Sequence, residues 1–253
     1  MRSFLSYMGG KSLLAAQIVK RMPKHHCYCE VFAGAAWVLF AKEESKVEII
    51  NDINTELVRL FRVVKLHLKE FIRYLEWVLN ARDEFERFKK ESPETLTDIQ
   101  RAVRFYFMVK SGYGARLVNP TFSIGPGRRP RMNPYRLEEE LFEVHNRLSG
   151  VYIENRPYAA VIERFDRPTT FFYIDPPYYD CENFYGKGIF EKEDFVGLHR
   201  LCSEMKGKFI MSINDVPPIR KLFEAFKIET VKTSYSVAKD SNKKVTELLI
   251  SNF

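Results

Sequence analysis

The feature that most constrains the fold is a short, fully hydrophobic run that ends abruptly in an acidic, proline-rich turn. Residues 171–174 read Phe-Phe-Tyr-Ile, and such continuous hydrophobicity is typical of a strand buried on both faces of a parallel sheet. The run stops at Asp175-Pro176-Pro177-Tyr178. Because open α/β sheets bind ligands beyond the carboxyl ends of their strands, we expect these four residues to lie at a binding site.

Strands and helices alternate at both ends of the chain, which is the pattern of an α/β sheet. Near the start, the pattern predicts a helix over residues 13–21 with Ser12 as its cap, a strand over 27–31, a helix over 35–42 and a strand over 47–50. Beyond position 150, it predicts strands over residues 151–153, 171–174, 208–213, 228–234 and 245–251, and helices over 191–205 and 218–226.

A helical block interrupts this alternation. Hydrophobic residues from Leu57 to Leu68 recur at spacings of three and four, which predicts a helix. Further helices are predicted over residues 97–110 and 137–148. Glycines and prolines crowd between these two helices, so residues 112–134 are predicted to form a loop or hairpin.

These patterns predict two domains that differ in charge as well as in structure. We expect residues 1–55 and 150–253 to form an α/β domain into which residues 56–149 are inserted as a mainly helical domain. The net charge of the 253 residues is +7, yet the stretch from Arg101 to Arg136 alone contains eight basic and no acidic residues. This stretch therefore carries the whole excess. It is expected to attract a polyanion, above all nucleic acid, and a solvated basic surface is the alternative.

The Asp-Pro-Pro-Tyr turn suits the activation of an aromatic amino group. Such a group is a poor nucleophile, because its lone pair is delocalised into the ring. The Asp175 carboxylate and the Pro176 carbonyl could accept its two hydrogens and localise the lone pair, while Pro177 stiffens the turn. Tyr178 offers a face on which a base extruded from a duplex can stack. The alternative interpretation is an ordinary turn that ends a strand.

A loop of small residues and a following acid indicate an adenosine-containing cofactor. Phe32 and Gly34 lie within residues 30–36, between the first predicted strand and the helix that follows it. Asp52 comes directly after the second strand, where an acid commonly binds ribose hydroxyls. The glycines are too few for a dinucleotide fingerprint, so a hydride-transfer cofactor is disfavoured.

Two further clusters each allow two interpretations. Tyr7-Met8-Gly9-Gly10-Lys11 opens a helix and could hold a carboxylate or phosphate, or could simply cap the helix. The run from His25 to Cys29 could suggest zinc, but no second ligand pair follows at a suitable spacing. Cys27 and Cys29 fall on one face of a strand, so we expect buried core thiols and no metal.

Cysteine content and hydropathy predict a cytoplasmic protein with reduced thiols. Four cysteines are too few for a disulfide scaffold. No hydrophobic run reaches the roughly 18 residues that a membrane span needs, so no membrane association is expected. Met1-Arg2-Ser3-Phe4 lacks the hydrophobic core of a signal peptide.

Together and in this order, the motifs resemble those of the Dam-type DNA adenine methyltransferases of bacteria and phages. The resemblance covers almost the whole chain. It rests on Tyr7-x-Gly9-Gly10-Lys11, Phe32-x-Gly34, Asn51-Asp52-Ile53-Asn54, the stretch from Arg101 to Asn119, Asp175-Pro176-Pro177-Tyr178, and residues 212–215 and 247–250.

The resemblance implies a Rossmann-like fold with a mostly parallel seven-stranded sheet and an inserted target-recognition domain. It also implies transfer of a methyl group from S-adenosylmethionine to the exocyclic amino nitrogen of a flipped adenine in double-stranded DNA, without a metal. Lys11 would meet the methionine carboxylate and Asp52 the ribose. The residues carried over by position are the cofactor contacts Tyr7, Lys11, Phe32, Gly34, Asp52 and Asp175, and the catalytic residues Asp175, Pro176, Pro177 and Tyr178.

The same resemblance and the basic stretch predict how the protein meets DNA. The expected partner is double-stranded DNA, with the chain acting as a monomer in a bacterial or phage-infected cell. The sequence leaves two roles open, one with a cognate restriction endonuclease and one without. The expected DNA contacts are Tyr113, Arg116, Arg128, Arg129 and Arg131.

Two departures from the family pattern bear on this reading, and three rivals compete with it. Ala36 replaces a second loop glycine, which is expected to narrow the cofactor's approach, and Gly114 stands where Asn is usual, so a GATC target is not implied.

Two of the rival functions differ from this one at the position of Asp175. A cytosine amino methyltransferase usually has Ser in place of Asp175, and RNA or protein-glutamine enzymes usually have Asn. A DNA-binding relative without catalysis is disfavoured by the intact Asp175, Lys11 and Asp52.

Overall fold

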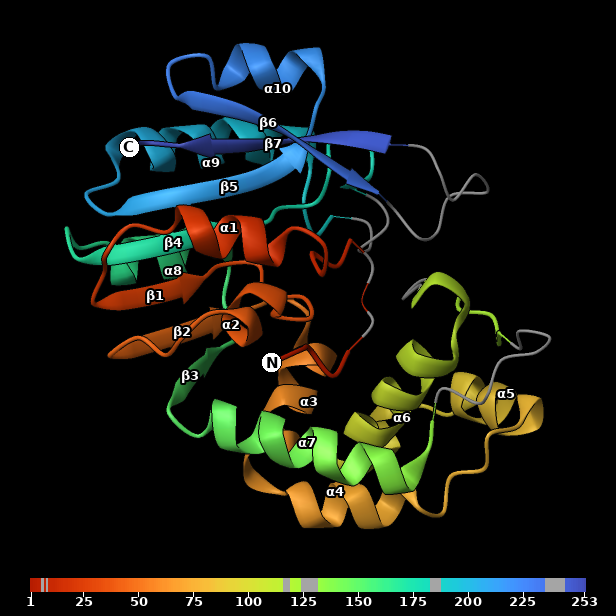
Figure 1. Ribbon diagram of the computed structural model, residues 1–253. Coiled ribbons are helices and arrows are strands. Elements are labelled where there is room, and N and C mark those ends of the chain that lie inside the picture. Colours follow the sequence, from red (N-terminus) through yellow and green to blue (C-terminus); the bar gives the residue numbers. More distant parts are fainter. Residues whose placement is uncertain (6, 8, 116–118, 124–131, 183–187, 235–243) are drawn as a thin grey trace.

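The computed structural model (Figure 1) describes the chain except for residues 6, 8, 116–118, 124–131, 183–187 and 235–243. Its seven-stranded sheet has the order β3-β2-β1-β4-β5-β7-β6. The strands are β1 (Cys27–Glu30), β2 (Val47–Asn51), β3 (Val151–Glu154), β4 (Thr170–Ile174), β5 (Lys208–Asn214), β6 (Lys227–Ser234) and β7 (Lys244–Ser251). Strands β1 to β5 run parallel, whereas β7 is antiparallel to β5 and β6. This confirms the α/β fold and the mostly parallel sheet that the resemblance implied.

The alternation of buried side chains along the strands explains why helices cover both faces of the sheet. In β4, Phe171 and Tyr173 belong to one hydrophobic cluster, while Phe172 and Ile174 belong to another, as a two-residue period requires. In Figure 1, α1 lies in front of the sheet, and α8 and α9 lie behind it. The first cluster contains residues of α1 (Ala15–Arg21) and α2 (Trp37–Ala41), and the second contains residues of α8 (Tyr158–Phe165), α9 (Lys192–Glu204) and α10 (Pro217–Leu222).

The helical block lies between β2 and β3 in the chain and gathers to one side of the sheet (Figure 1). Two of its helices begin with side-chain caps: Asn54 accepts from two backbone amides, and Thr97 forms a capping box with Gln100. The helices are α3 (Thr55–Leu66), α4 (Leu68–Leu75), α5 (Arg82–Lys90), α6 (Asp98–Ser111) and α7 (Pro134–Leu148). Among the described residues, no helix combines the length and the hydrophobicity that a membrane span needs.

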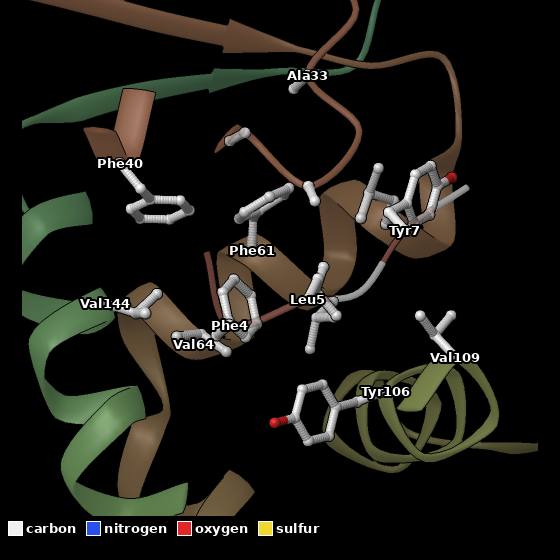
Figure 2. Packing of buried hydrophobic residues seen from close by; sticks show 14 of the residues in the cluster. Phe4, Leu5, Tyr7, Ala33, Phe40, Phe61, Val64, Tyr106, Val109 and Val144 are labelled. Atoms are coloured by element: carbon white, nitrogen blue, oxygen red, sulfur yellow. The ribbon is translucent and has the colours of Figure 1, made fainter. Parts of the chain in front are cut away.

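A hydrophobic core shared by both predicted domains holds the first residues of the chain (Figure 2). Phe4 is only 2% exposed. Its ring centroid lies 6.2 Å from that of Phe40 in α2, 5.7 Å from that of Phe61 in α3 and 6.0 Å from that of Tyr106 in α6. One buried cluster therefore crosses the boundary predicted near residue 55, and an independent domain over residues 56–149 stays a prediction.

Several local expectations need correction. Helix α1 begins only at Ala15, and its N-cap is Leu14 rather than Ser12, without a side-chain cap. Helix α8 was not expected, because its eight residues are too few to display a clear helical period. Helix α10 ends at Leu222, short of the predicted residue 226. Cys27 is only partly buried, so the expectation of a core thiol holds for Cys29 alone.

Candidate active site

A cavity of about 440 Å³ lies beyond the carboxyl ends of β1, β2 and β4, within the size range of small-molecule sites. Its lining joins the motif near the N-terminus, the loops after β1 and β2, and the turn after β4. The predicted site residues that line it are Tyr7, Lys11, Phe32, Gly34, Asp52, Asp175 and Pro177. The fold therefore brings together residues that are far apart in the sequence, including all six predicted cofactor contacts.

The loop after β1 is tied to Asp52 and shaped by a left-handed glycine. Gly34 has φ +48°, and a Cβ there would lie 3.3 Å from the Tyr7 ring, so both backbone and space favour glycine. The Gly34 amide donates to Asp52 Oδ2 at 2.9 Å, and the Asn54 amide donates to Oδ1 at 2.9 Å. Burial raises the pKa of Asp52, while these backbone donors oppose the rise. Each carboxylate oxygen keeps a second lone pair for a further donor.

Ala36, which replaces the family's second glycine, also adopts a left-handed conformation. Its φ of 51° and ψ of 39° are unfavourable for a residue with a Cβ, at a cost of about 1–2 kcal/mol. Its side chain is fully buried in the hydrophobic cluster, whereas Ala33, Gly34 and Ala35 line the cavity. The substitution therefore strains the backbone at the start of α2 rather than narrowing the cofactor's approach.

A buried ion cluster occupies the end of the cavity next to the Asp-Pro-Pro-Tyr turn. The ammonium of Lys11 lies 2.8 Å from Asp175 Oδ1 and 3.1 Å from Glu247 Oε1. It also donates to the Tyr178 hydroxyl at 2.8 Å, and that hydroxyl in turn donates to Glu247. The Lys11 side chain is 4% exposed and that of Glu247 is 1% exposed, so this pair is nearly sealed from water, whereas the Asp175 side chain is 18% exposed.

Asp175 is held firmly on one of its two oxygens. Oδ1 accepts from Lys11 and from the Ser212 hydroxyl at 3.0 Å, and the Ser212 oxygen lies 2.7 Å from the Tyr173 hydroxyl. Oδ2 makes no hydrogen bond to any residue that the structure describes. Burial raises the pKa of Asp175, and Lys11 and Ser212 oppose the rise.

The rest of the Asp-Pro-Pro-Tyr turn is equally constrained. Pro176 and Pro177 are buried. The Asn214 side chain holds the residue after the turn, accepting from the Tyr179 amide at 2.9 Å and donating to its carbonyl at 3.1 Å. The Tyr178 ring is partly buried, and the Lys11 ammonium lies 4.5 Å from its centroid. The predicted stacking role of Tyr178 is not tested by this arrangement.

Glu30 is a second buried carboxyl group on the cavity wall, and it lies at the end of β1. It is 1% exposed, and its Oε2 accepts from the Tyr28 hydroxyl at 2.8 Å and the Leu39 amide at 3.0 Å. Burial raises the pKa of Glu30 to about 8, against the opposing effect of these hydrogen bonds. Near neutral pH this group is therefore largely protonated.

Several cavity residues escaped sequence reasoning. Tyr158 and Phe190 flank Phe32, with ring centroids 5.5 and 5.9 Å from its own, and the Tyr158 ring is stacked on it. Arg156 also lines the cavity, as does Ile53, which belongs to a predicted motif but was given no role of its own. Their position in the sequence could have identified them as cavity residues. Arg156 and Tyr158 follow β3 and Ile53 follows β2, at the same edge of the sheet.

The predicted DNA contacts are described only in part. Tyr113 follows α6 and is 51% exposed, while Arg116, Arg128, Arg129 and Arg131 lie outside the described residues. Arg101 is paired with Glu56, and Arg104 donates to the Phe88 carbonyl at 2.6 Å, with burial lowering the pKa of its guanidinium. The basic stretch is therefore not uniformly available to a polyanion, because its first two arginines stabilise the helices.

The histidine and cysteine run near the N-terminus has ordinary structural partners. His25 Nδ1 lies 2.7 Å from the Pro23 carbonyl, and Nε2 lies 2.9 Å from the Ser45 hydroxyl. Within the described residues, no group of three or more His, Cys, Asp or Glu side chains is placed to hold a metal ion.

The fold and the site define a class of protein. A mostly parallel seven-stranded sheet, with a cofactor-sized cavity and an acidic turn beyond its central strands, is the architecture of a Rossmann-like methyltransferase. Residues 7–237 match the D12 class N6 adenine-specific DNA methyltransferases. The chain therefore belongs to this family, and it is an enzyme of DNA adenine methylation.

Individual relatives span nearly the same length. A DNA adenine methylase of Escherichia coli K12 is 27% identical over 98% of this chain and 94% of its own. The type II methyltransferase M.MjaIII of Methanocaldococcus jannaschii is 29% identical over 100% of this chain and 99% of its own. The type II methyltransferase M1.LlaDCHI of Lactococcus lactis is 28% identical over 100% and 96%. Methyltransferases of this kind use S-adenosylmethionine in general.

The buried carboxyl of Glu30 predicts a specific pH dependence of stability. Its folded pKa of about 8 exceeds its ordinary value of 4.5, so its contribution is complete below the ordinary pKa and is lost as pH rises through the folded one. Relative to Glu30→Gln, the free energy of unfolding of the wild type should fall by on the order of 2–5 kcal/mol across this window. Chemical denaturation at a series of pH values measures it, with the surface variant Glu229→Gln as control. Parallel curves for wild type and Glu30→Gln would contradict the assignment.

Proposed function

We propose that this enzyme methylates an adenine flipped out of a specific site in duplex DNA, with Asp175, Pro176, Pro177 and Tyr178 as its catalytic turn. The observation that carries the proposal is the state of Asp175. Its Oδ1 is fixed by Lys11 and Ser212, while its Oδ2 has no partner among the described residues. A fixed carboxylate with one oxygen available, beside the cavity, suits an acceptor for an amino hydrogen.

The residues of this cavity fit S-adenosylmethionine. Gly34 lets a ligand approach the loop backbone, Asp52 keeps lone pairs for ribose hydroxyls, and the Phe32 ring offers an apolar wall. Tyr7 and Lys11 complete the proposed contacts, and Lys11 would share its ammonium between Asp175, Glu247 and the methionine carboxylate. When bound, the cofactor supplies a methyl group that is already activated by its sulfonium sulfur.

The chain's own contribution to the reaction is mainly positioning. Asp175 and the Pro176 carbonyl would accept the two amino hydrogens and localise the nitrogen lone pair. Pro177 and the Asn214 clamp keep the turn rigid. Tyr178 would hold the flipped base against its ring, whose hydroxyl is already anchored to Lys11 and Glu247.

DNA is proposed to bind across the helical block, through Tyr113, Arg116, Arg128, Arg129 and Arg131. The support is the exposure of Tyr113 after α6 and the concentration of positive charge in this part of the sequence. Arginine can read guanine in the major groove or bind phosphate, and we expect both uses here.

Further partners follow from the kind of relatives that the chain has. We infer that a cognate restriction endonuclease accompanies the enzyme, since two of the relatives are named type II methyltransferases. Four cysteines without disulfides support action in a reducing cytoplasm. A monomer on DNA is the oligomeric state that the resemblance implies.

Replacing the catalytic carboxylate should abolish methyl transfer but leave DNA binding and folding intact. Asp175→Ala is expected to slow methyl transfer by at least about 100-fold, with DNA affinity and melting temperature close to those of the wild type. Single-turnover transfer of labelled methyl groups to duplex DNA measures the rate, and the exposed Asp83→Ala is the control. Substantial turnover by Asp175→Ala would rule out the proposed activation.

The cofactor assignment is tested without any turnover. Asp52→Ala should weaken S-adenosylmethionine binding by about 1–3 kcal/mol, the scale of a lost charged hydrogen-bond partner. Calorimetry measures the affinity. Asp166→Ala is a matched control, because Asp166 also accepts from two backbone amides but lies away from the cavity. An unchanged affinity in Asp52→Ala would remove Asp52 from the cofactor site.

The DNA contacts divide into two kinds with different signatures. Alanine at a phosphate-binding arginine should weaken all duplexes alike and lower the salt slope by about one. Alanine at a base-reading arginine should cost about 1–3 kcal/mol on the cognate site only. We expect at least one base reader among Arg116, Arg128, Arg129 and Arg131, measured on cognate and random duplexes across salt concentrations. If all four variants bind DNA as tightly as the control Arg87→Ala, and with the same salt slope, the DNA must bind elsewhere on the protein.

A further inference from the structure

A glutamate in the interior of the sheet stands out because its burial has an energetic cost that packing does not explain. Glu247 of β7 is fully buried and is followed by the core residues Leu248 and Ile250. Its register partners, Asn214 of β5 and Val231 of β6, carry no charge. A buried carboxylate is tolerated when it is paired, and an apolar residue would fill such a position at lower cost.

Only one of the two carboxylate oxygens of Glu247 is paired among the described residues. Its Oε1 contacts Lys11 and the Tyr178 hydroxyl, while its Oε2 is buried with no hydrogen-bond partner among the described residues. Among the described residues, the charged groups that face it are Lys11, from the segment before α1, and Asp175, from the turn after β4. Glu30, at the end of β1, faces Asp175 in turn, and burial keeps it largely protonated near neutral pH by raising its pKa to about 8. With both carboxylates ionised, one ammonium stands against two negative charges, so this cluster carries a net charge of −1.

An excess negative charge is what the proposed reaction needs at this point. As the bond from the methyl carbon to the amino nitrogen forms, the bond from that carbon to sulfur breaks, and the positive charge passes to the nitrogen. The nitrogen must then lose one hydrogen as a proton. The nearest acceptor in the proposed arrangement is the Asp175 carboxylate, whose Oδ2 faces no other hydrogen-bonding partner in the described structure.

We propose that Glu247 is a positioning residue for this methyl transfer: by pairing with Lys11, it leaves the cluster one negative charge in excess, so that Asp175 can take up the proton from the amino nitrogen. The inference rests on the proposed function, because it requires Asp175 to contact the amino group. With Glu247, proton uptake takes the cluster from −1 to neutral. Without it, the same uptake would take the cluster's own side chains from neutral to +1, which the low-dielectric interior disfavours. The methionine end of the bound cofactor leaves this difference unchanged, because its carboxylate is accompanied by an ammonium group of its own.

The surroundings of the two carboxyl groups agree with this division of roles. Burial raises the pKa of Glu247, the charge of Asp175 raises it further, and Lys11 opposes both effects. The two groups therefore titrate as a coupled pair. The excess negative charge is lost when pH falls through the raised pKa of this pair. The rate of methyl transfer should therefore decline toward acid pH, which gives the pH–rate profile an acid limb.

The test compares Glu247→Gln and Glu247→Asp with wild type, and uses Glu229→Gln of the neighbouring strand β6 as the matched control. The single-turnover rate is measured across pH at saturating cofactor and DNA. Two readouts do not depend on activity: S-adenosylmethionine affinity by calorimetry, and melting temperature across pH without cofactor.

For Glu247→Gln we expect a rate about 100-fold lower, the scale of a general-base contribution. Its cofactor affinity should be no weaker than that of the wild type, because Lys11 stays available to the methionine carboxylate. The acid limb of its pH–rate profile should move to lower pH. The reason is that Asp175 loses a like-charged neighbour, which lowers the pKa of its carboxyl group. Its melting temperature near neutral pH should equal or exceed that of the wild type, since a buried carboxyl with a raised pKa destabilises the fold as pH rises. Glu247→Asp keeps the charge, so it should retain the wild-type acid limb and a rate well above that of Glu247→Gln.

Three results would overturn the inference. The first is a Glu247→Gln variant with the wild-type rate and the wild-type acid limb of the pH–rate profile. The second is a Glu247→Asp protein that folds but is as slow as Glu247→Gln. The third is a Glu247→Gln melting temperature that drops near neutral pH, as expected for a purely structural residue. Asp175→Ala, assayed in parallel, separates this inference from the proposed function. An active Asp175→Ala defeats both, whereas an inactive Asp175→Ala beside a fully active Glu247→Gln defeats only the role of Glu247.

Discussion

The site is organised around the buried ammonium group of Lys11. Its contacts with Asp175 and Glu247 join three parts of the chain that are remote in sequence: the segment before α1, the turn after β4, and β7. A charge so well shielded from water persists only when it is paired, and the two carboxylates have the same requirement. The Lys11 ammonium is therefore stable in this place because at least one carboxylate pairs with it.

This requirement gives the N-terminal segment its importance. Lys11 can reach the cluster only if the residues before it are fixed, and Phe4 fixes them by packing among rings from α2, α3 and α6. The helical block is thus part of the framework that positions the chemistry. A single core links the helices proposed to meet DNA with the segment that supplies the Lys11 ammonium to the cluster.

The cofactor side of the cavity depends on backbone conformation more than on charge. Gly34 bends the loop after β1 so that its amide meets Asp52, and the neighbouring Ala36 keeps a left-handed conformation without the freedom of glycine. The strain at Ala36 persists because α2 and the cluster beneath it hold the loop in place. Loop shape and Asp52 thereby form one unit at the edge of the sheet.

The sequence by itself determined the α/β class, most strand positions and the identity of the motif residues, because a two-residue period and strand-terminal acids are local signals. It did not reveal Tyr158 or Phe190 at the cavity, the pairing of Arg101 with Glu56, or the left-handed state of Ala36. These depend on which segments meet after folding. The motif at residues 247–250 gave Glu247 no role. Only the tertiary structure decided that Glu247 faces Lys11, because an antiparallel β7 beside β5 brings that strand to the site.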